Sequence, residues 1–178
     1  AKLLAKELGF IYIDTGAMYR ALTLKALRKN ISLENIESLT KLAKSTEIQF
    51  KNMDFRQNIY CDDIDVTEEI RSPEVNLNVS KLASYPAIRD IMVKEQRKLA
   101  RAFPVVMDGR DIGECVLPDA DFKFFVTASI EERARRRVLE LSKSGHNTTF
   151  AEVKEDIAQR DTSDANRGVG ALKILDDA

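Results

Sequence analysis

The sequence contains few of the residues that build cysteine- or histidine-based sites. Cys61 and Cys115 are its only cysteines, His146 is its only histidine, and the 178 residues include no tryptophan. Two cysteines are too few for a disulfide scaffold or a cysteine-ligated metal site, and one histidine excludes a histidine-rich one. We therefore expect two reduced thiols, as in a cytoplasmic protein, and no protein-built metal centre.

Long apolar runs and an excess of charge are also missing. No apolar stretch approaches the length of a membrane span, and no secretory signal is present, so we expect no membrane association. The formal net charge is −1 and the pI is near 6.0, and no stripe of aromatic residues offers a stacking platform. These properties disfavour a nucleic-acid-binding surface. They leave room for a small phosphate-bearing ligand, because a few local arginines can hold one.

The apolar periodicity predicts an α/β fold. Continuous apolar runs at 10–13, 105–107 and 122–126 are typical of buried parallel strands, whereas the alternating stretches 47–51 and 55–60 predict a small antiparallel sheet. Helices are expected at 1–8, 17–29 and 32–44, and Ser32 is the predicted cap of the third. Two more are expected to begin at prolines, one at Ser72-Pro73 and one running from Pro86 to about 101. The last two are expected from the Ser129 capping box to about 144 and from Thr149 to about 160. A polar hinge containing His146 is expected at 145–148.

Two Asp–Gly–Arg corners follow predicted strands. The first is Asp14-Thr15-Gly16-Ala17-Met18-Tyr19-Arg20, and the second is Asp108-Gly109-Arg110-Asp111-Ile112-Gly113. In open α/β sheets the ligand crevice lies at the carboxyl ends of the strands. Arginine there presents a planar, permanently charged fork that suits a phosphate. The two corners therefore predict an anionic substrate held between them, although each alone is compatible with an ordinary turn or a capped helix.

Three further groups of polar residues carry weaker signals. Ser80 and Arg89 flank the break at Pro86, and surface polarity explains either residue alone. Arg133 and Arg137 share a helix face within the basic run 131–137, where like charges repel unless an anion lies between them or Glu131 and Glu132 offset them. The polar segment 160–167 contributes Arg160, Asp164 and Arg167 but also fits a solvated charge run.

Together and in this order, these groups resemble the bacterial cytidylate kinase family of the nucleoside monophosphate kinase group, over essentially the whole chain. The resemblance implies a P-loop kinase fold with a parallel-sheet core, a monophosphate-binding insert at 46–84 and a helical lid at 140–165. It implies phosphoryl transfer from ATP to CMP or dCMP in the presence of Mg²⁺. It also implies a cytoplasmic monomer whose partners are these nucleotides, with neither nucleic acid nor membrane bound.

The resemblance also implies a role for each candidate residue. Asp111 would accept from the exocyclic amine of cytosine, with Ser80 beside it and Arg89 on the acceptor side of the ring. The substrate-binding set further contains Asp14 and Tyr19, the sugar-binding Arg160 and Asp164, and the phosphate-binding Thr15, Arg20, Arg110 and Arg167. Arg133 and Arg137 would reach the ATP phosphates, and with Arg110 and Arg167 they form the catalytic set.

The chain departs from the family pattern at both ends. The family's glycine-rich P-loop would precede Ala1, and its last strand and helix would follow Ala178, so we expect 1–178 to be one incomplete kinase domain. Such a fragment would bind CMP but turn it over poorly or not at all. Residues 168–172 also lack the proline that the family usually has before the leucine.

Two alternatives stay open. A kinase for another nucleoside monophosphate would differ in the base-reading set Ser80, Arg89 and Asp111. A non-catalytic nucleotide-binding or RNA-associated module would explain the missing P-loop, but the near-neutral charge and the lack of a stacking stripe disfavour RNA.

Overall fold

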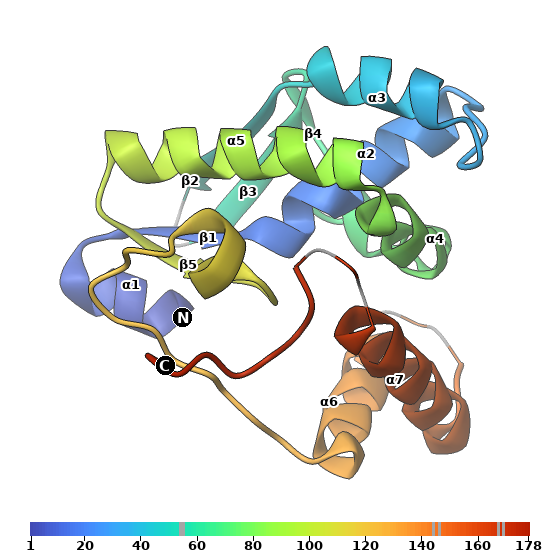
Figure 1. The fold of residues 1–178 in the computed structure, drawn as a ribbon. Helices are drawn as coiled ribbons and strands as arrows, with labels where there is room; N and C mark the ends of the chain where they lie inside the picture. Colours follow the sequence, from blue (N-terminus) through green and yellow to red (C-terminus); the bar gives the residue numbers. More distant parts are fainter. Residues whose placement is uncertain (54–55, 144, 146, 167, 169) are drawn as a thin grey trace. The chain divides into compact units, whose positions relative to one another are not determined.

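The computed structural model describes residues 1–178 except 54, 55, 144, 146, 167 and 169, and it leaves the side chains of 52, 53 and 56 undescribed. The chain divides into two compact units, Ala1–Ile112 and Gly113–Ala178. Both are shown in Figure 1. The mixture of a parallel strand pair, an antiparallel sheet and helices confirms the predicted α/β class.

A parallel pair of strands forms one layer of the first unit. β1 (Ile11–Asp14) pairs with β5 (Val105–Asp108), and the register places Asp14 opposite Asp108. Both strands therefore end at the same edge, as the apolar runs predicted. Helix α1 (Lys2–Leu8) precedes β1 and ends at Gly9, whose φ of 67° closes the helix in the left-handed conformation that glycine adopts without strain.

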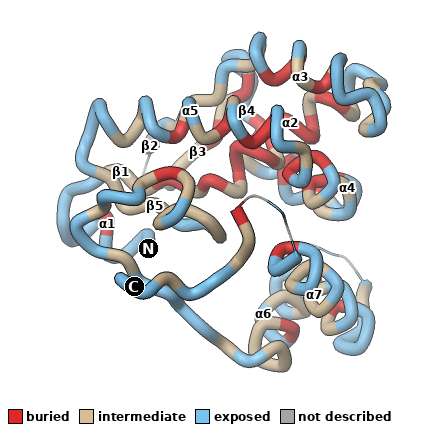
Figure 2. The backbone as a smooth tube through the Cα atoms, viewed as in Figure 1, coloured by how far each residue is buried: buried red, intermediate tan, exposed pale blue. Residues whose placement is uncertain are grey.

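Helix α2 (Thr15–Arg28) begins directly at the end of β1. It starts two residues before the predicted position because the side chain of Asp14 accepts from the backbone N–H of Ala17 at 2.9 Å and caps the first turn. Met18 and Leu22 lie in one apolar cluster with residues of α3, α4 and α5, whereas Ala17 and Ala21 lie in a second cluster with the antiparallel sheet. Helix α2 is thus the central element of this unit, and Figure 2 shows its buried face.

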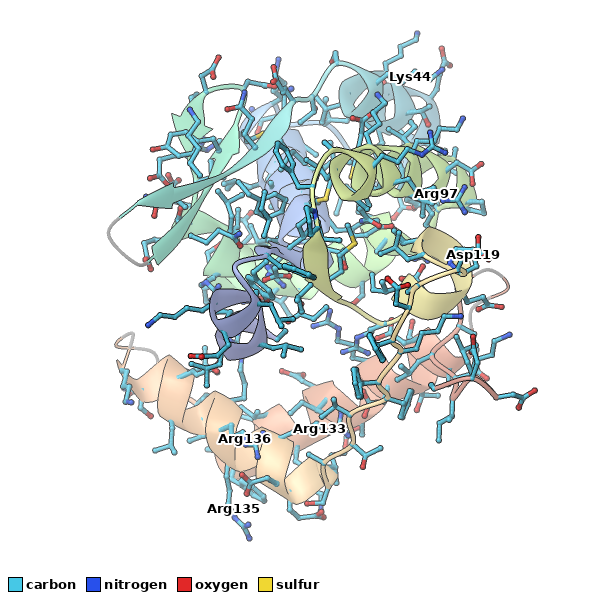
Figure 3. The ribbon with its side chains drawn as sticks, turned by 90° about the vertical axis from the view of Figure 1, so that its left-hand side faces the viewer. Lys44, Arg97, Asp119, Arg133, Arg135 and Arg136 are labelled. Carbon is cyan, nitrogen blue, oxygen red and sulfur yellow. The ribbon has the colours of Figure 1, made fainter. Side chains whose placement is uncertain are left out.

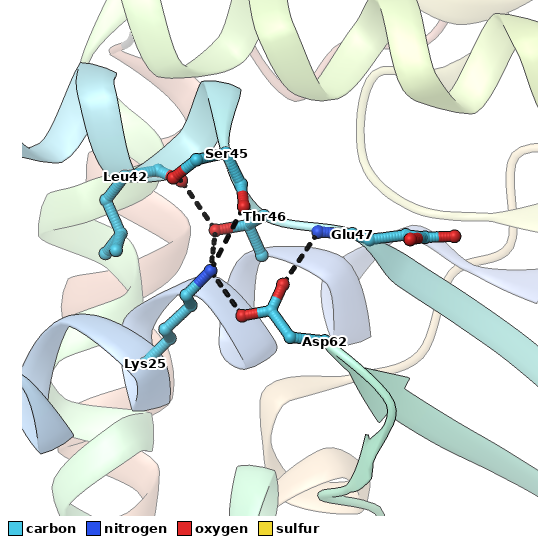
Figure 4. Close-up of polar contacts among 6 residues, drawn as sticks. All are labelled: Lys25, Leu42, Ser45, Thr46, Glu47 and Asp62. Atoms are coloured by element: carbon cyan, nitrogen blue, oxygen red, sulfur yellow. Dashed lines mark hydrogen bonds and ion pairs between the residues drawn. The ribbon is translucent and has the colours of Figure 1, made fainter.

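The predicted antiparallel sheet is present. It contains β2 (Ile48–Met53), β3 (Arg56–Cys61) and β4 (Ile64–Asp65) in that order. Asp62 and Asp63, with φ of 49° and 64°, form the tight turn between β3 and β4. Lys25 of α2 ties this turn to the start of β2, because its Nζ lies 2.5 Å from the Asp62 carboxylate and 2.8 Å from Thr46 Oγ1 (Figure 4).

Three helices cover the rest of this unit: α3 (Ile36–Lys44), α4 (Pro73–Ser84) and α5 (Pro86–Ala102). A short 3₁₀ turn, η1 (Glu69–Arg71), leads into α4, and Ser72 caps α4 as predicted. The predicted cap of α3 is wrong. Asn35, not Ser32, accepts from the N–H of Ser38 at 3.0 Å, whereas Ser32 accepts from the N–H of Glu34 in the turn before the helix. Asparagine caps as well as serine, and Asn35 stands directly before the first helical turn.

The second unit contains a helix pair. The junction residues form a π-helical turn, η2 (Ile112–Val116), and the pair consists of α6 (Ile130–Lys143) and α7 (Phe150–Ala165), which pack side by side (Figure 1). Ser129 caps α6, and Thr149 with Glu152 forms a full capping box at α7, as predicted. Helix α7 runs to Ala165, beyond the predicted end near 160, so Arg160 and Asp164 are helical. His146, expected in the hinge, lies outside the described residues.

The predicted strand at 122–126 is wrong. The segment is irregular, and Phe122, Phe124 and Val126 are 81%, 76% and 88% exposed. Its composition suits a buried strand, but no strand in the described part of the chain pairs with it, and a lone strand leaves its backbone groups unpaired. None of the described helices is both long enough and apolar enough to span a bilayer.

Candidate functional site

The two predicted corners meet at the carboxyl edge of the parallel strand pair. Thr15 donates from Oγ1 to the backbone oxygen of Asp108 at 2.8 Å, and the hydroxyl of Tyr12 donates to Asp108 Oδ2 at 2.6 Å. Gly109 packs so tightly here that an added Cβ would clash with Thr15 Oγ1 and approach Ile112 within 2.7 Å. These contacts fix the start of α2 against the turn that follows β5.

Tyr12 is a polar member of this edge that sequence reasoning did not select, and Asp108 was part of the second predicted corner but received no role of its own. Partial removal from water raises the pKa of the Asp108 carboxyl, the nearby charge of Asp14 raises it further, and the hydrogen bond from Tyr12 opposes both. Burial and the same hydrogen bond raise the pKa of Tyr12, which keeps its proton and acts as a donor. The available signal was the register: strands ending at one edge place the aspartates of both corners opposite each other.

Asp14 and Arg20 form an ion pair at the start of α2. Arg20 Nη2 lies 2.7 Å from Asp14 Oδ2, and only 16% and 19% of the two side chains are exposed. A Cβ at Gly16 would lie 3.1 Å from Arg20 Nη1, so the missing side chain leaves room for this guanidinium. No described residue accepts from the buried Arg20 Nε. A guanidinium held near a helix N-terminus is suited to an anion, because the helix dipole acts in the same direction.

Arg89 and Asp111 form a second, more deeply buried pair. Arg89 Nη2 binds Asp111 Oδ2, Nη1 donates to the backbone oxygen of Ala83 at 3.3 Å, and the two side chains are 4% and 11% exposed. Ser80 lies one turn before Ala83 on α4, on the same helix face. The three residues that the sequence grouped as a base-reading set thus come from α4, α5 and the turn after β5 of a single unit.

Other predicted residues of the first unit take different positions. Tyr19 is 7% exposed and lies in the apolar cluster with Met18 and Leu22. Thr15 is 4% exposed and uses its hydroxyl proton in the bond to Asp108, while its oxygen can still accept. Arg110 is the second residue after the end of β5, and it is half-buried.

The remaining candidates lie on α6 and α7 of the second unit. Arg133 Nη2 lies 2.6 Å from Asp161 Oδ2, and Arg137 Nη1 lies 3.1 Å from Glu140. Arg160 Nε lies 3.8 Å from Asp164, whose side chain is 1% exposed. Figure 3 shows Arg135 extending from α6, in keeping with its 67% exposed side chain. Arg167 lies outside the described residues, so its predicted place beside the substrate phosphate stays a prediction.

The chemistry of these residues suits a phosphate-bearing ligand better than a protein-built metal centre. Among the described residues no group of three or more histidine, cysteine, aspartate or glutamate side chains could hold a metal ion. Asp14 and Asp108 nevertheless end adjacent strands. Mg²⁺ typically takes one or two carboxylates and completes its shell with substrate phosphates and water. Burial is the main cause of the raised pKa of Asp108, and such an ion would offset the smaller contribution from the nearby charge of Asp14.

Comparisons with known proteins show the family of the chain. The family described as cytidylate kinase matches residues 1–178. The chain is 52% identical over 178 residues to the cytidylate kinase of Caldanaerobacter subterraneus subsp. tengcongensis, covering all of this chain and 78% of that protein. It is 52% identical to the cytidylate kinase of Desulfitobacterium hafniense and 48% identical to that of Bacillus cereus strain B4264, again over the whole chain and over 76% and 79% of those proteins.

Proposed function

The chain belongs to the cytidylate kinase family, and we propose that it transfers the terminal phosphoryl group of ATP to CMP or dCMP. A phosphate oxygen of the acceptor attacks the γ-phosphorus of ATP, the bond to the β,γ-bridging oxygen breaks, and CDP or dCDP and ADP are formed. The observation that carries the proposal beyond family membership is the buried Arg89–Asp111 pair, close in sequence to a second guanidinium, Arg110, at the strand edge.

Base recognition is assigned to Asp111, Arg89 and Ser80. The carboxylate of Asp111 accepts from N4 of cytosine, and Arg89 donates to O2 and N3. Uracil presents an oxygen where cytosine presents its amine, so UMP would leave the Asp111 carboxylate facing an acceptor. An unpaired buried polar group costs about 1–3 kcal/mol, which is enough to favour CMP over UMP.

The acceptor phosphate is assigned to Arg20, Arg110 and Arg167, with Thr15 beside them. Asp14 orients Arg20 through the 2.7 Å ion pair. Tyr19, one residue before Arg20, belongs to the proposed substrate-binding set, and its side chain lies in the apolar cluster. Phosphoryl transfer asks the protein chiefly to position the two phosphates and to stabilise charge on the migrating group. Guanidinium groups that converge on the phosphates provide both the positioning and the stabilisation of charge.

ATP is assigned to arginines of the second unit. Arg133 and Arg137 would bind the ATP phosphates, and Arg160 and Asp164 the sugar hydroxyls of the acceptor. The carboxylates of Asp14 and Asp108 end adjacent strands and would contact a magnesium ion through water, because both oxygens of Asp14 already accept from Ala17 N–H and Arg20. When bound, the ion neutralises charge on the phosphates.

The proposal is tested by product analysis. We expect the full-length protein, supplied with ATP, Mg²⁺ and CMP, to form CDP and ADP in equal amounts, and AMP or UMP to be poor acceptors. A preference for AMP would favour a kinase for another monophosphate. CMP binding without turnover in the full-length protein would favour a non-catalytic nucleotide-binding module. We also propose that the enzyme acts as a cytoplasmic monomer without nucleic acid, since its substrates are small nucleotides.

A further inference from the structure

Asp161 has no role in the assignments above, although it stands inside the polar segment 160–167. In the second unit its carboxylate reaches across the helix pair from α7 to α6, where Oδ2 lies 2.6 Å from Arg133 Nη2. The side chains of Asp161 and Arg133 are 27% and 36% exposed, so the pair is partly accessible to solvent. The hydrogen bond to Asp161 raises the pKa of Arg133 despite partial burial, so its guanidinium stays charged.

The contact uses only part of the guanidinium. Arginine carries five N–H donors in a rigid, planar fork, and one carboxylate oxygen engages one end of it. The buried Nε of Arg133 has no acceptor among the described residues. A side chain with this many rotatable bonds loses much conformational freedom when it binds a ligand, and a partner that already fixes the plane of the fork reduces that loss.

We propose that Asp161 is a positioning residue for ATP: it holds the guanidinium of Arg133 in one orientation across α6 and α7, so that the terminal N–H groups not bonded to Asp161 are presented to the donor phosphates. The inference rests on the proposed function, in which Arg133 contacts ATP. It assigns to Asp161 an effect on the donor nucleotide, while its neighbours Arg160 and Asp164 are assigned to the acceptor.

A purely structural role for Asp161 makes a different prediction, and the chain provides a matched control. Glu131 and Lys154 form a second ion pair between the same two helices, with 2.8 Å between the charged atoms and 44% and 42% exposed side chains. If the Arg133–Asp161 pair only fastened α6 to α7, neutralising Glu131 would resemble neutralising Asp161. If Asp161 acts through Arg133, only the Asp161 variants should change ATP binding.

The test compares Asp161→Ala, Asp161→Asn and Glu131→Gln in the full-length protein. We expect Asp161→Ala to raise the Kd for a non-hydrolysable ATP analogue, measured by calorimetry, by about tenfold, as loss of one orienting charge-assisted bond would. The KM for ATP should rise in parallel, and the KM for CMP should stay within about twofold. Asp161→Asn, which keeps an acceptor oxygen, should fall between Asp161→Ala and the parent, and Glu131→Gln should match the parent.

A double-mutant cycle decides whether Asp161 acts through Arg133. Arg133→Ala and the double variant Arg133→Ala/Asp161→Ala should bind the ATP analogue equally, because no guanidinium is left to orient. Additive losses, an equal effect of Glu131→Gln, or tighter ATP binding by Asp161→Ala would each overturn the inference. Failure of the parent protein to phosphorylate CMP would instead overturn the proposed function, so the two failures are distinguishable.

Discussion

Arg89 of α5 and Asp111, which follows β5, form an ion pair with only 4% and 11% of their side chains exposed. Taking two charges out of water is costly, and their mutual attraction roughly offsets that cost only while both are present. The pair therefore contributes little net stability, but either charge alone would be strongly unfavourable. A buried ion pair of this kind places a hydrogen-bond donor and a hydrogen-bond acceptor side by side, as a binding site for a nucleotide base requires.

Replacing Arg89 by methionine should destabilise the fold. The remaining Asp111 carboxylate would be buried without its partner, which costs about 3–5 kcal/mol of unfolding free energy. Urea denaturation measures the loss. The double variant Arg89→Met/Asp111→Leu should recover a substantial part of it while binding no CMP, and a double variant as unstable as the single one would contradict this account of the pair.

Replacing Asp111 by asparagine should reduce the discrimination between CMP and UMP. The asparagine amide can donate to O4 of uracil, so the ratio of kcat/KM for CMP to that for UMP should fall by a factor corresponding to about 1–3 kcal/mol. Steady-state assays with both acceptors measure the ratio. Asp90→Asn, an exposed position on α5, is the matched control and should keep the parent ratio. An unchanged ratio in Asp111→Asn would remove this residue from base recognition.

Adding one methyl group at Gly109 should disturb both corners of the strand edge. A Cβ there would collide with Thr15 Oγ1 and approach Ile112, so Gly109→Ala should lower the unfolding free energy by about 1–3 kcal/mol and weaken CMP binding. Thermal unfolding with and without CMP measures both effects. At Gly168 a Cβ would meet nothing within 4 Å, so Gly168→Ala serves as the stability control. If Gly109→Ala were as stable as the parent, the strand edge would have room for a Cβ at this position, against the close packing described.

The Lys25–Asp62 pair should make stability depend on acidic pH. Burial disfavours ionisation of Asp62, but hydrogen bonds from Lys25 and from the N–H of Glu47 outweigh it and lower the pKa of the carboxyl. A lowered pKa stabilises the fold above the ordinary aspartate value, and this contribution is lost as the pH falls through the lowered one. Because Asp62 is 41% exposed, Asp62→Asn should cost only about 0.5–1 kcal/mol at pH 7.

The pH dependence of the Asp62→Asn variant tests whether the charge of Asp62 causes its effect on stability. Asparagine tolerates the positive φ of 49° at this turn, so Asp62→Asn changes charge without straining the backbone. The difference in unfolding free energy between parent and variant should begin to shrink below about pH 4, where the carboxyl of the unfolded chain takes up a proton, and should be lost as the pH falls through the lowered pKa of the folded protein. A difference that stays constant from pH 7 to pH 3 would show that the charge of Asp62 is not its cause.

Local chemistry was predictable from the sequence wherever a short motif decides the structure. Pro73 after Ser72 starts α4, and Thr149 with Glu152 starts α7 through a capping box. The cap of α3 was not predictable in the same way, because Ser32 and Asn35 are both good caps. The segment 122–126 shows the larger limit: its apolar residues suit a strand, but a strand forms only where a neighbouring backbone pairs with it.

The candidate site was predictable to the extent that strand ends determine it. The corners at Asp14 and Asp108 meet because β1 and β5 are parallel and in register. The partners of the charged groups were not predictable, because they depend on side-chain packing between distant elements. Tyr12 binding Asp108 and Asp161 binding Arg133 are examples, and neither spacing nor composition indicates them. The burial of Tyr19 likewise follows from the packing of α2.

The central claim is that the Arg89–Asp111 pair reads the base of a cytidine monophosphate. A crystal structure of the full-length protein with CMP tests it most directly, through the distance from N4 of cytosine to the Asp111 carboxylate. The account predicts a hydrogen bond of about 2.7–3.2 Å there, with Arg89 donating to the acceptor side of the ring. Cytosine bound elsewhere, with the Arg89–Asp111 pair still closed upon itself, would contradict it.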